Sequence, residues 1–533
     1  MEANLADLFE LAVDTFGDRE YIVAEGKRRT YAEIEDRANR LAHYLRRQGV
    51  KADDHVGIYA YNCVEWVESL WAIFKLRAVW VNINYRYVAD ELRYIVDNAD
   101  LVGLIHAREF SDRLAQIPDA LGGLRFRLVI EDGTGVEVEA GSDDYEEVLA
   151  GESGERDFGH RSGDDLYILY TGGTTGMPKG VVWRHEDVFY ALGGGINVVT
   201  SERVADPADL ARRGAEGFPL TSLPIAPLMH GASQWSVMGG SFQGNRVVLV
   251  SKFDPNRVWE LVEEEKVNLL FITGDAMGRP LIEALEASDR TYDTSSLFAL
   301  ASTAAVFSPS VKDQFIDHFP KLVVSDAIGS SETGGNGHIQ VTKGAVMKGG
   351  PTVHAVADTV VLDDDLNELP PGSGTIGKVA RRGNIPIGYY KDPVKTAETF
   401  VEGPNGVRYA MPGDFALLEA DGTITLLGRG SVCINSGGEK IYPEEVEAAV
   451  KSHPAVWDAT VIGVADERWG QRVAAVVQLR GGASLALEEL QDHCRTKIAG
   501  YKLPRQLTVV DEVVRSPSGK PDYRWAREAA EAS

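Results

Sequence analysis

A strand-like run that leads directly into a loop of glycine and threonine constrains this chain more than any other feature. Leu166-Tyr-Ile-Leu-Tyr170 is typical of a buried strand, and Thr171-Gly-Gly-Thr-Thr-Gly-Met-Pro-Lys-Gly180 follows it without a break. Glycines let a backbone approach a ligand closely, while clustered N–H groups, three threonine hydroxyls and Lys179 suit a phosphate tail. A plain Gly/Thr turn is the alternative. The loop lacks the Gly-Lys-Ser/Thr order of a Walker A motif, so it indicates another way of using ATP.

Segments before this loop alternate between helical and strand-like patterns. Between Tyr31 and Gln48, apolar residues recur every three or four positions, which predicts an amphipathic helix. Val56-Gly-Ile-Tyr-Ala60 is typical of a buried strand, and the apolar stretch from Trp66 to Phe74 predicts another helix. Such alternation favours an α/β fold with a largely parallel sheet, and 533 residues exceed one ordinary core.

A smaller unit is expected after the segment Leu427-Gly-Arg-Gly-Ser431. Pro443 suits the first turn of a helix, two strand-like runs follow between 459 and 479, and another helix is expected from Leu487 to Ile498. About 100 residues are enough for a separate domain. We therefore expect an N-terminal domain of layered sheets and helices at residues 1–429, and a small, mobile α+β domain at residues 430–533.

Composition narrows the classes of function and the compartment. The chain carries 80 acidic against 54 basic residues, a formal charge of −26, which should repel nucleic acid and anionic membranes. Three scattered cysteines indicate a reducing compartment without a disulfide framework. The N-terminus has acids where a signal peptide has basic residues, and no run of 18 apolar residues occurs. We expect a cytoplasmic protein with no transmembrane segment and no nucleic-acid partner; its oligomeric state is open, a homodimer included.

Further motifs follow the glycine–threonine loop in a recognisable order. They are Ser302-Thr-Ala-Ala305, Ile328-Gly-Ser-Ser-Glu-Thr333, Gly413-Asp414, Leu427-Gly-Arg-Gly430 and Ser516-Pro-Ser-Gly-Lys520. With the loop at 170–180, they make the chain resemble the adenylate-forming superfamily of acyl-CoA synthetases, aryl-CoA ligases, luciferases and peptide-synthetase adenylation domains. The resemblance covers essentially the whole length. It implies that ATP activates a carboxylic acid as an acyl-AMP.

The resemblance assigns nucleotide and metal roles to matching positions. Glu332 corresponds to the carboxylate that holds Mg²⁺ beside the ATP phosphates, with Thr171 as a second oxygen ligand; a surface acid is the alternative. Asp414 corresponds to the ribose-binding aspartate and Arg429 to a basic residue near ribose or phosphate, for which an interdomain salt bridge is the alternative. The other ATP- or AMP-binding residues that the resemblance implies are Gly172, Gly173, Thr174, Thr175, Gly176, Lys179, Thr303, Ala304, Ala305, Ile328, Gly329, Ser330 and Ser331.

Three of these positions depart from the family pattern. Thr303 and Ala304 replace glycines whose backbone lines adenine, which narrows that wall. Ile328 replaces a tyrosine that usually lies against the base, so stacking there is not expected.

Lys520, in a Pro/Ser/Gly turn near the C-terminus, matches the family's catalytic lysine. The substrate carboxylate and the α-phosphate are both anionic, so each needs its charge neutralised as they approach. The resemblance implies that Lys520 does this on one side and Mg²⁺ on the other, with no covalent enzyme intermediate. Considered alone, a lysine in such a turn is ordinarily just solvated.

The residues around His230 bear on the identity of the acid. His230 stands where amino-acid-activating members carry the aspartate that pairs with an amine, so an acid without an α-amino group is expected. We assign it a catalytic role, and a packed core histidine is an equal alternative. Small residues nearby predict a wide pocket for a bulky or long hydrophobic acid. The predicted acyl-pocket residues are His230, Gly231, Trp235, Phe271, Gly274, Met277 and Phe307.

The acceptor follows from Ser436-Gly-Gly-Glu-Lys-Ile-Tyr-Pro443, which resembles the CoA-ligase version of this loop. Gly437 and Gly438 would let the pantetheine arm pass close to the backbone. Ser431 stands at the hinge about which the family rotates its small domain, where Asp or Lys is commoner. The motifs Met229-His-Gly-Ala232, Thr273-Gly-Asp-Ala276 and Ala301-Ser-Thr-Ala-Ala305 resemble those of the actinobacterial FadD-type synthetases that activate steroid side-chain acids.

Together these features predict an enzyme that uses ATP, Mg²⁺ and CoA to convert a long-chain or steroid side-chain acid to its CoA thioester. An acyl-AMP ligase that feeds a carrier protein is one alternative. A luciferase-like monooxygenase acting on its own adenylate is another.

Overall fold

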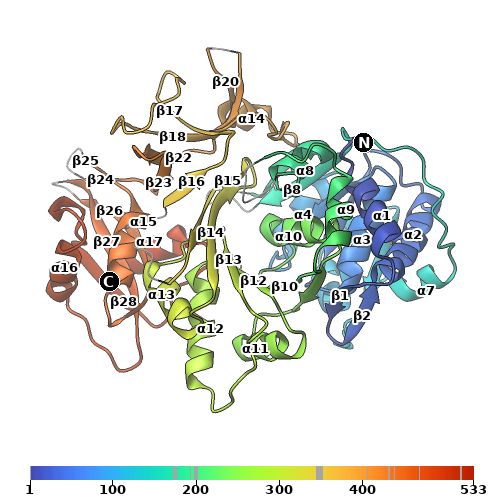
Figure 1. The fold of residues 1–533 in the computed structure, drawn as a ribbon, viewed down its shortest axis with the longest axis horizontal. Helices are drawn as coiled ribbons and strands as arrows, with labels where there is room; N and C mark the ends of the chain where they lie inside the picture. The colour runs from blue at the N-terminus through green and yellow to red at the C-terminus, as the bar shows by residue number, and fades with distance from the viewer. Residues whose placement is uncertain are drawn as a thin grey trace.

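The computed structural model contains three β-sheets arranged along the chain. It describes residues 2–171, 177–192, 194–196, 202–343, 352–404, 406–429, 432–436, 439–466, 469–516 and 519–532. Within these residues, the sheets have eight, fifteen and five strands. Figure 1 shows the eight-stranded sheet with its helices at the blue and cyan end, the long sheet through the middle, and the five-stranded sheet at the red end.

The eight-stranded sheet has the order β19-β9-β8-β4-β3-β5-β6-β7 and is parallel from β8 to β7. The predicted helix from Tyr31 is α2, and it begins with a capping box between Thr30 and Glu33. The strand before the glycine–threonine loop is β8, which pairs antiparallel with β9 on the other side of that loop. The elements of this layer are α1 (Leu5–Phe16), α2 (Tyr31–Arg47), β3 (His55–Tyr59), α3 (Val64–Lys75), β4 (Val79–Asn82), α4 (Ala89–Asn98), β5 (Leu101–Ala107), α5 (Ser111–Leu114), α6 (Pro118–Leu121), β6 (Phe126–Ile130), β7 (Asp143–Asp144), α7 (Tyr145–Ala150), β8 (Leu166–Thr171), β9 (Lys179–Arg184), α8 (His185–Ala191) and β19 (Gly388–Tyr389).

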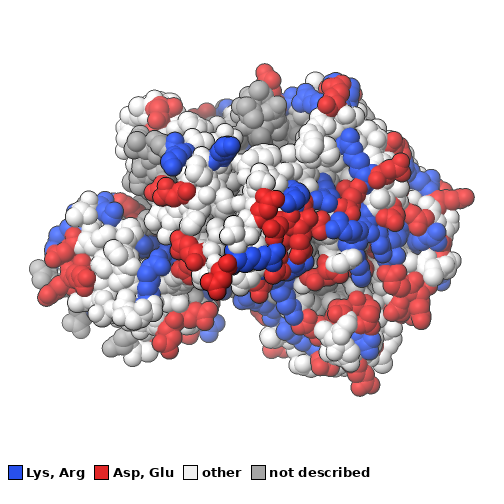
Figure 2. All heavy atoms as spheres, turned by 60° about the horizontal axis from the view of Figure 1, so that its bottom comes forward, with Lys and Arg blue, Asp and Glu red and all other residues white. Residues whose placement is uncertain are grey.

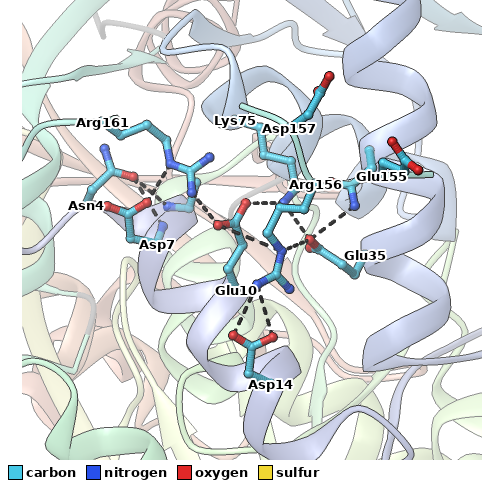
Figure 3. A network of polar contacts seen from close by, with 12 residues as sticks. Asn4, Asp7, Glu10, Asp14, Glu35, Lys75, Glu155, Arg156, Asp157 and Arg161 are labelled. Atoms are coloured by element: carbon cyan, nitrogen blue, oxygen red, sulfur yellow. Dashed lines mark hydrogen bonds and ion pairs between the residues drawn. The ribbon is translucent and has the colours of Figure 1, made fainter. Parts of the chain in front are cut away.

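A buried ion network ties the first three helices to the segment that leads into β8 (Figure 3). The side chain of Lys75 on α3 is fully buried and pairs with Glu10 of α1 and Glu35 of α2. Arg156 donates to Glu35 at 2.8 Å, and Arg161 pairs with Glu10. Because a buried charge is costly unless it is paired, the network holds these elements in one arrangement. It therefore fixes where β8 begins.

The fifteen-stranded sheet has the order β2-β1-β11-β10-β12-β13-β14-β15-β16-β23-β22-β18-β21-β20, with β17 paired to β18. Strands β11, β10, β12, β13 and β14 are parallel, and β14 with β15 is antiparallel. Its elements are β1 (Glu20–Ala24), β2 (Lys27–Thr30), α9 (Asp209–Glu216), β10 (Thr221–Pro224), α10 (Gly231–Ser241), β11 (Arg246–Leu249), α11 (Pro255–Glu264), β12 (Leu269–Ile272), α12 (Asp275–Ala287), β13 (Ala299–Ser302), α13 (Pro309–His318), β14 (Val323–Ser330), β15 (Gly334–Val341), β16 (Thr352–Ala355), β17 (Thr359–Leu362), β18 (Ile376–Arg381), α14 (Pro393–Thr399), β20 (Phe400–Glu402), β21 (Arg408–Ala410), β22 (Asp414–Leu418) and β23 (Thr423–Arg429).

Alternate residues of this sheet's parallel strands have different environments. Leu270 and Ile272 of β12, with Leu300 of β13 and Val324 of β14, lie in one core cluster with residues of α11, α12 and α13. Side chains of a strand point alternately to the two faces, so their neighbours in sequence face the other way. That second face is where α10 lies.

The five-stranded sheet has the order β25-β24-β27-β26, with β28 paired to β27. Its two core clusters are separate from those of the larger sheets. The elements are β24 (Ile434–Ser436), β25 (Glu439–Ile441), α15 (Pro443–Lys451), β26 (Val456–Asp466), β27 (Gly470–Leu479), α16 (Leu487–Arg495), β28 (Gln506–Val510) and α17 (Tyr523–Glu531). The predicted division near Arg429 stays a prediction, and residues 430 and 431 lie outside the described part.

Side chains from both sides of that division meet at Trp457 of β26. The guanidinium groups of Arg279, on α12, and Arg480 lie 5.4 and 5.5 Å from its ring centre. Arg480 also pairs with Glu283 of α12 at 3.4 Å. The small unit is thus seated on α12, and this contact determines where the Lys520 turn lies.

One face of the molecule carries charges of both signs (Figure 2). Figure 2 shows acidic and basic side chains interspersed on one face rather than segregated into patches. A helix long and apolar enough to cross a bilayer is not found among the described residues.

Candidate active site

A cavity of about 1030 Å³ lies between α10 and the second face of the long sheet. Its floor is formed by the residues that alternate with the core positions: Leu269, Phe271, Ala301, Ser325 and Ala327. Three of these five side chains are small, so the sheet leaves the space open. The cavity extends from the carboxyl ends of the strands, near Thr303 and Ala304, to their amino ends, near Leu220 and Ser222.

Helix α10 forms one long wall of the cavity. Its lining residues recur at helical spacing, as Gly231, Ala232, Trp235, Ser236, Gly239 and Gly240. Only Trp235 is large, so this face of the helix is nearly flat. Two of the predicted pocket residues on α10, Gly231 and Trp235, therefore lie where the sequence pattern placed them.

His230 is the N-cap of α10, and its loop is fixed from three sides. Asn62 accepts from the Leu228 N–H at 2.6 Å, and Asn82 Nδ2 donates to the Met229 carbonyl at 2.7 Å. Gln234 Nε2 donates to the Leu228 carbonyl at 2.7 Å. Burial, and then the positive charges of Lys520 and Arg86, lower the pKa of His230 to about 3. Its Nε2 atom is buried without a hydrogen-bond partner in the described structure, so a neutral imidazole faces the cavity.

Lys520 reaches the cavity from a tight turn of the small unit. The Ser516 N–H donates to the Lys520 carbonyl at 2.9 Å, and the Lys520 N–H donates to Ser516 Oγ at 3.1 Å. Gly519 has φ +74°, and a Cβ on it would lie 3.0 Å from the Ala276 side chain and 3.2 Å from the Thr273 carbonyl. Glycine is therefore required both for the turn and for the close contact with α12.

Arg515 braces this turn against β26. Its guanidinium donates to the Gly519 carbonyl at 3.1 Å and pairs with the Asp458 carboxylate at 2.5 Å. Burial opposes ionisation of Asp458, but Lys451 and Arg515 hold the pKa of this carboxyl well below its ordinary value. The ion pair therefore persists at neutral pH and ties Lys520 to the small sheet.

The other end of the cavity carries most of the predicted nucleotide residues whose side chains the structure describes. Those that line it are Thr171, Thr303, Ala304, Ile328, Gly329, Ser330 and Ser331, together with Lys520. Ala304 has φ +69°, in the left-handed region that favours glycine. The backbone here keeps a glycine-like conformation although the residue is alanine.

Glu332 lies beside the strands that bracket the glycine–threonine loop. Its Oε1 accepts from the Tyr389 hydroxyl at 2.8 Å, and the preceding Ser331 carbonyl accepts from Trp183 Nε1 at 2.9 Å. Glu332 itself is not among the cavity-lining residues. Lys179, at the start of β9, forms an ion pair with Asp392, and this lowers the pKa of the Asp392 carboxyl.

Several predicted residues lie elsewhere. Met277 and Phe307 belong to the core cluster on the opposite face of the sheet, and Gly274 is the N-cap of α12. None of these three lines the cavity, contrary to the prediction. Ala305 contacts the Lys520 turn instead, 3.5 Å from a Cβ built on Gly519. Asp414 is the partner of Arg429 across β22 and β23, and Asp414 does not line the cavity. The side chain of Arg429 is not described. The predicted residues that lie outside the described part of the chain are Gly172, Gly173, Thr174, Thr175, Gly176, Ser431, Gly437 and Gly438.

Some residues that line the cavity belong to none of the sequence motifs and are not predicted from the sequence. Asn84 and Arg86 follow β4, and Gln243 and Asn245 follow α10 at the far end. For Asn84 and Arg86, a position just after a buried strand was a usable signal, because ligands gather at the carboxyl ends of parallel strands. The periodic small residues of α10 were a second usable signal.

Comparisons with known proteins agree with this architecture. The AMP-binding enzyme family matches residues 9–390, and the AMP-binding enzyme C-terminal domain matches residues 445–520. The chain is 55% identical to a 3-oxocholest-4-en-26-oate–CoA ligase of Rhodococcus rhodochrous, over 99% of this chain and 96% of the relative. It is 54% identical to a medium/long-chain-fatty-acid–CoA/3-oxocholest-4-en-26-oate–CoA ligase of Mycobacterium tuberculosis, with the same coverage.

A solved structure of the anthranilate CoA ligase AuaEII in complex with anthranoyl-AMP shares the fold. The TM-score is 0.84 at 22% identity, and the match covers 99% of this chain and 98% of that one. The expected α/β architecture, with a large N-terminal and a small C-terminal part, is thereby confirmed. So is the resemblance seen in the sequence motifs: the chain belongs to the AMP-binding enzyme family, the adenylate-forming superfamily.

Proposed function

We propose that this enzyme is an AMP-forming acid–thiol ligase that converts a long-chain or steroid side-chain carboxylic acid to its CoA thioester. Its substrates are ATP, the acid and CoA. The acid and ATP give acyl-AMP and pyrophosphate, and the CoA thiol then attacks the acyl carbon and displaces AMP. The observation that carries the proposal is one continuous cavity, with largely apolar walls on one side of Lys520 and the nucleotide motifs on the other.

The proposed roles follow from position in the cavity. Lys520 neutralises charge between the acid carboxylate and the α-phosphate, at the point where the small unit meets the strand ends. His230, held neutral by its surroundings, is proposed to border the carboxylate without adding a second positive charge. Thr303, Ala304, Ile328, Gly329, Ser330 and Ser331 line the adenosine side, with the loop at 172–176 proposed for the phosphates.

We also propose Mg²⁺ as a cofactor, and the residues present fit it. Glu332 lies beside the loop's flanking strands, and its Oε2 makes no hydrogen bond within the described residues. Mg²⁺ usually takes one or two carboxylates and completes its shell with phosphates and water, so a single acid with the Thr171 hydroxyl is adequate. When bound, the ion would neutralise phosphate charge. We further propose that Asp414 and Arg429 bind ribose, that Gly437 and Gly438 lie along CoA, and that Ser431 is the hinge. A domain boundary at 429/430, a cytoplasmic location and a homodimer are also proposals.

The direct test is CoA-dependent AMP release with a panel of fatty, aryl and steroid side-chain acids. We expect release with fatty and steroid acids, a strict requirement for ATP and CoA, and no dependence on oxygen. Release only with a carrier protein as acceptor, or oxygen-dependent product without CoA, would contradict the proposal.

A further inference from the structure

The far end of the cavity, away from Lys520, carries polar side chains beside Leu220 and Leu269, although the walls that lead to it are largely apolar. Helix α10 is 11 residues long, so at 1.5 Å per residue it separates His230 from this end by roughly 16 Å. Ser222, Gln243 and Asn245 line the cavity there. A pocket for a purely hydrocarbon tail would gain nothing from such groups, because an apolar ligand would strip them of water.

Two asparagines beside this end allow a controlled comparison. Asn245 Oδ1 accepts from the Leu220 N–H at 3.0 Å, and Asn268 Oδ1 accepts from the next N–H, of Thr221, at 2.9 Å. A backbone N–H can only donate, so in both residues the atom that faces it must be the oxygen. The other atom of each side chain is therefore an NH₂ donor.

The two donors have different surroundings. Asn268 Nδ2 donates to the Ser296 carbonyl at 3.2 Å, and Asn268 does not line the cavity. Asn245 Nδ2 donates to no group in the described part of the chain, and Asn245 does line the cavity. A Cβ built on Gly240, another lining residue, would lie 4.0 Å from this nitrogen. The Asn245 oxygen thus accepts a hydrogen bond from the backbone, and its NH₂ group is available to a ligand in the cavity.

We propose that Asn245 Nδ2 is a specificity group that donates a hydrogen bond to an acceptor, such as a ring carbonyl, carried by the acid at the end opposite its carboxylate. The inference rests on the proposed ligase function and names a feature of its substrate. A site built to hydrogen-bond a substrate group discriminates against an analogue that lacks it, because the bound analogue shields the half-buried Asn245 donor from water and gives it no partner. A fatty acid can still occupy the cavity, but it forgoes this contact.

The test compares three side-chain steroid acids that differ only at the far ring: a 3-oxo acid, its 3-hydroxy analogue and its 3-deoxy analogue. The readout is the ratio of kcat/KM values for CoA-dependent AMP release. The wild-type enzyme should favour the oxo over the deoxy acid by at least about tenfold. Equal values for these two acids would overturn the proposal.

Asn245→Asp sharpens the test because it keeps the oxygen that Leu220 needs and replaces the NH₂ donor by a second acceptor. We expect this variant to reverse the preference, favouring the 3-hydroxy acid, which can donate, over the 3-oxo acid by about tenfold. Asn268→Asp is the matched control, and its oxo-to-hydroxy ratio should equal that of the wild type. An unchanged ratio in Asn245→Asp would contradict the assignment.

Melting temperatures show whether each variant is folded. If Asn245→Asp does not fold, the ratio of kcat/KM values for the oxo and deoxy acids in the wild-type enzyme still tests the proposal. Hexadecanoic acid, as a further substrate, distinguishes failure of the far-end donor from failure of the proposed ligase function. AMP release with hexadecanoate but equal use of the three steroid acids overturns the far-end donor alone. No release with any acid overturns the proposed function itself.

Discussion

The two ends of the cavity are built in different ways. The nucleotide end consists of loops at the carboxyl ends of strands, where Thr303, Ala304 and the Ser330–Ser331 turn line the space and Lys520 approaches from the small unit. The acyl end consists of regular elements, the flat face of α10 and the small residues of the sheet. The groups proposed to take part in the reaction lie at the nucleotide end, and the acyl end mainly provides space for the acid. Substitutions should therefore affect rate at the first end and choice of acid at the second.

The largest expected effect is at the chemical end, with Lys520→Ala. Removing the charge should lower the rate of ATP–pyrophosphate exchange by about 100- to 1000-fold, as loss of a single transition-state contact does elsewhere. Thioester formation from supplied acyl-AMP should decline far less, since that step does not bring two anions together. Measuring both half-reactions on one preparation checks this, and normal exchange in the variant would contradict the role of Lys520.

A smaller effect, confined to choice of acid, is expected from Gly240→Leu at the shape end. A Cβ at this position meets only ordinary contacts, the nearest being the Asn245 Cβ at 3.7 Å, so the helix should tolerate it. The leucine would then occupy the far end of the cavity. We expect kcat/KM for a steroid acid to decrease roughly 100-fold and that for hexanoic acid to change little, in keeping with steric exclusion from a packed site. Equal losses for both acids would contradict a purely spatial role.

The histidine between the two ends should show in the pH dependence of stability. The folded pKa of about 3 lies below the unfolded value near 6.5, so the unfolded chain binds the proton first as pH decreases. The free energy of unfolding should therefore decrease from pH 6.5 toward pH 3, by up to about 1.4 kcal/mol per pH unit for this residue. In His230→Gln this contribution should be missing, which urea denaturation at pH 7 and pH 5 can measure. Identical slopes in both proteins would contradict a buried neutral imidazole.

The smallest effect is expected at the adenine wall. Ala304→Gly should relieve the left-handed strain and raise the free energy of unfolding by about 0.5–1 kcal/mol. Its neighbour Ala305 has no positive φ, so Ala305→Gly should lower stability by a similar amount. A loss of stability in both variants would show that the strain at Ala304 is not significant.

The same contrast explains what could be predicted from the sequence. Fold class, family and the nucleotide-end positions follow from short contiguous motifs, because loops at strand ends need particular residues in a fixed order. The size and sequence position of Met277 and Phe307 predict a place in the acyl pocket, yet both residues face the helical side of the sheet. The alternation along β12 indicates the two faces correctly: Leu269 and Phe271 face the cavity, and Leu270 and Ile272 face the helical core. Asn245 could not have been found this way, because its role depends on the Leu220 N–H, which lies 25 residues away.

In this cavity, the acid's own oxygen is expected to attack the α-phosphate of ATP. The most direct measurement uses a steroid or fatty acid labelled with ¹⁸O in its carboxylate, followed by mass analysis of the products after one round of CoA-dependent turnover. Displacement of AMP by the CoA thiol breaks the bond between the acyl carbon and the bridging oxygen, so we predict one ¹⁸O atom in AMP and none in pyrophosphate. Unlabelled AMP, or label in inorganic phosphate, would contradict the account.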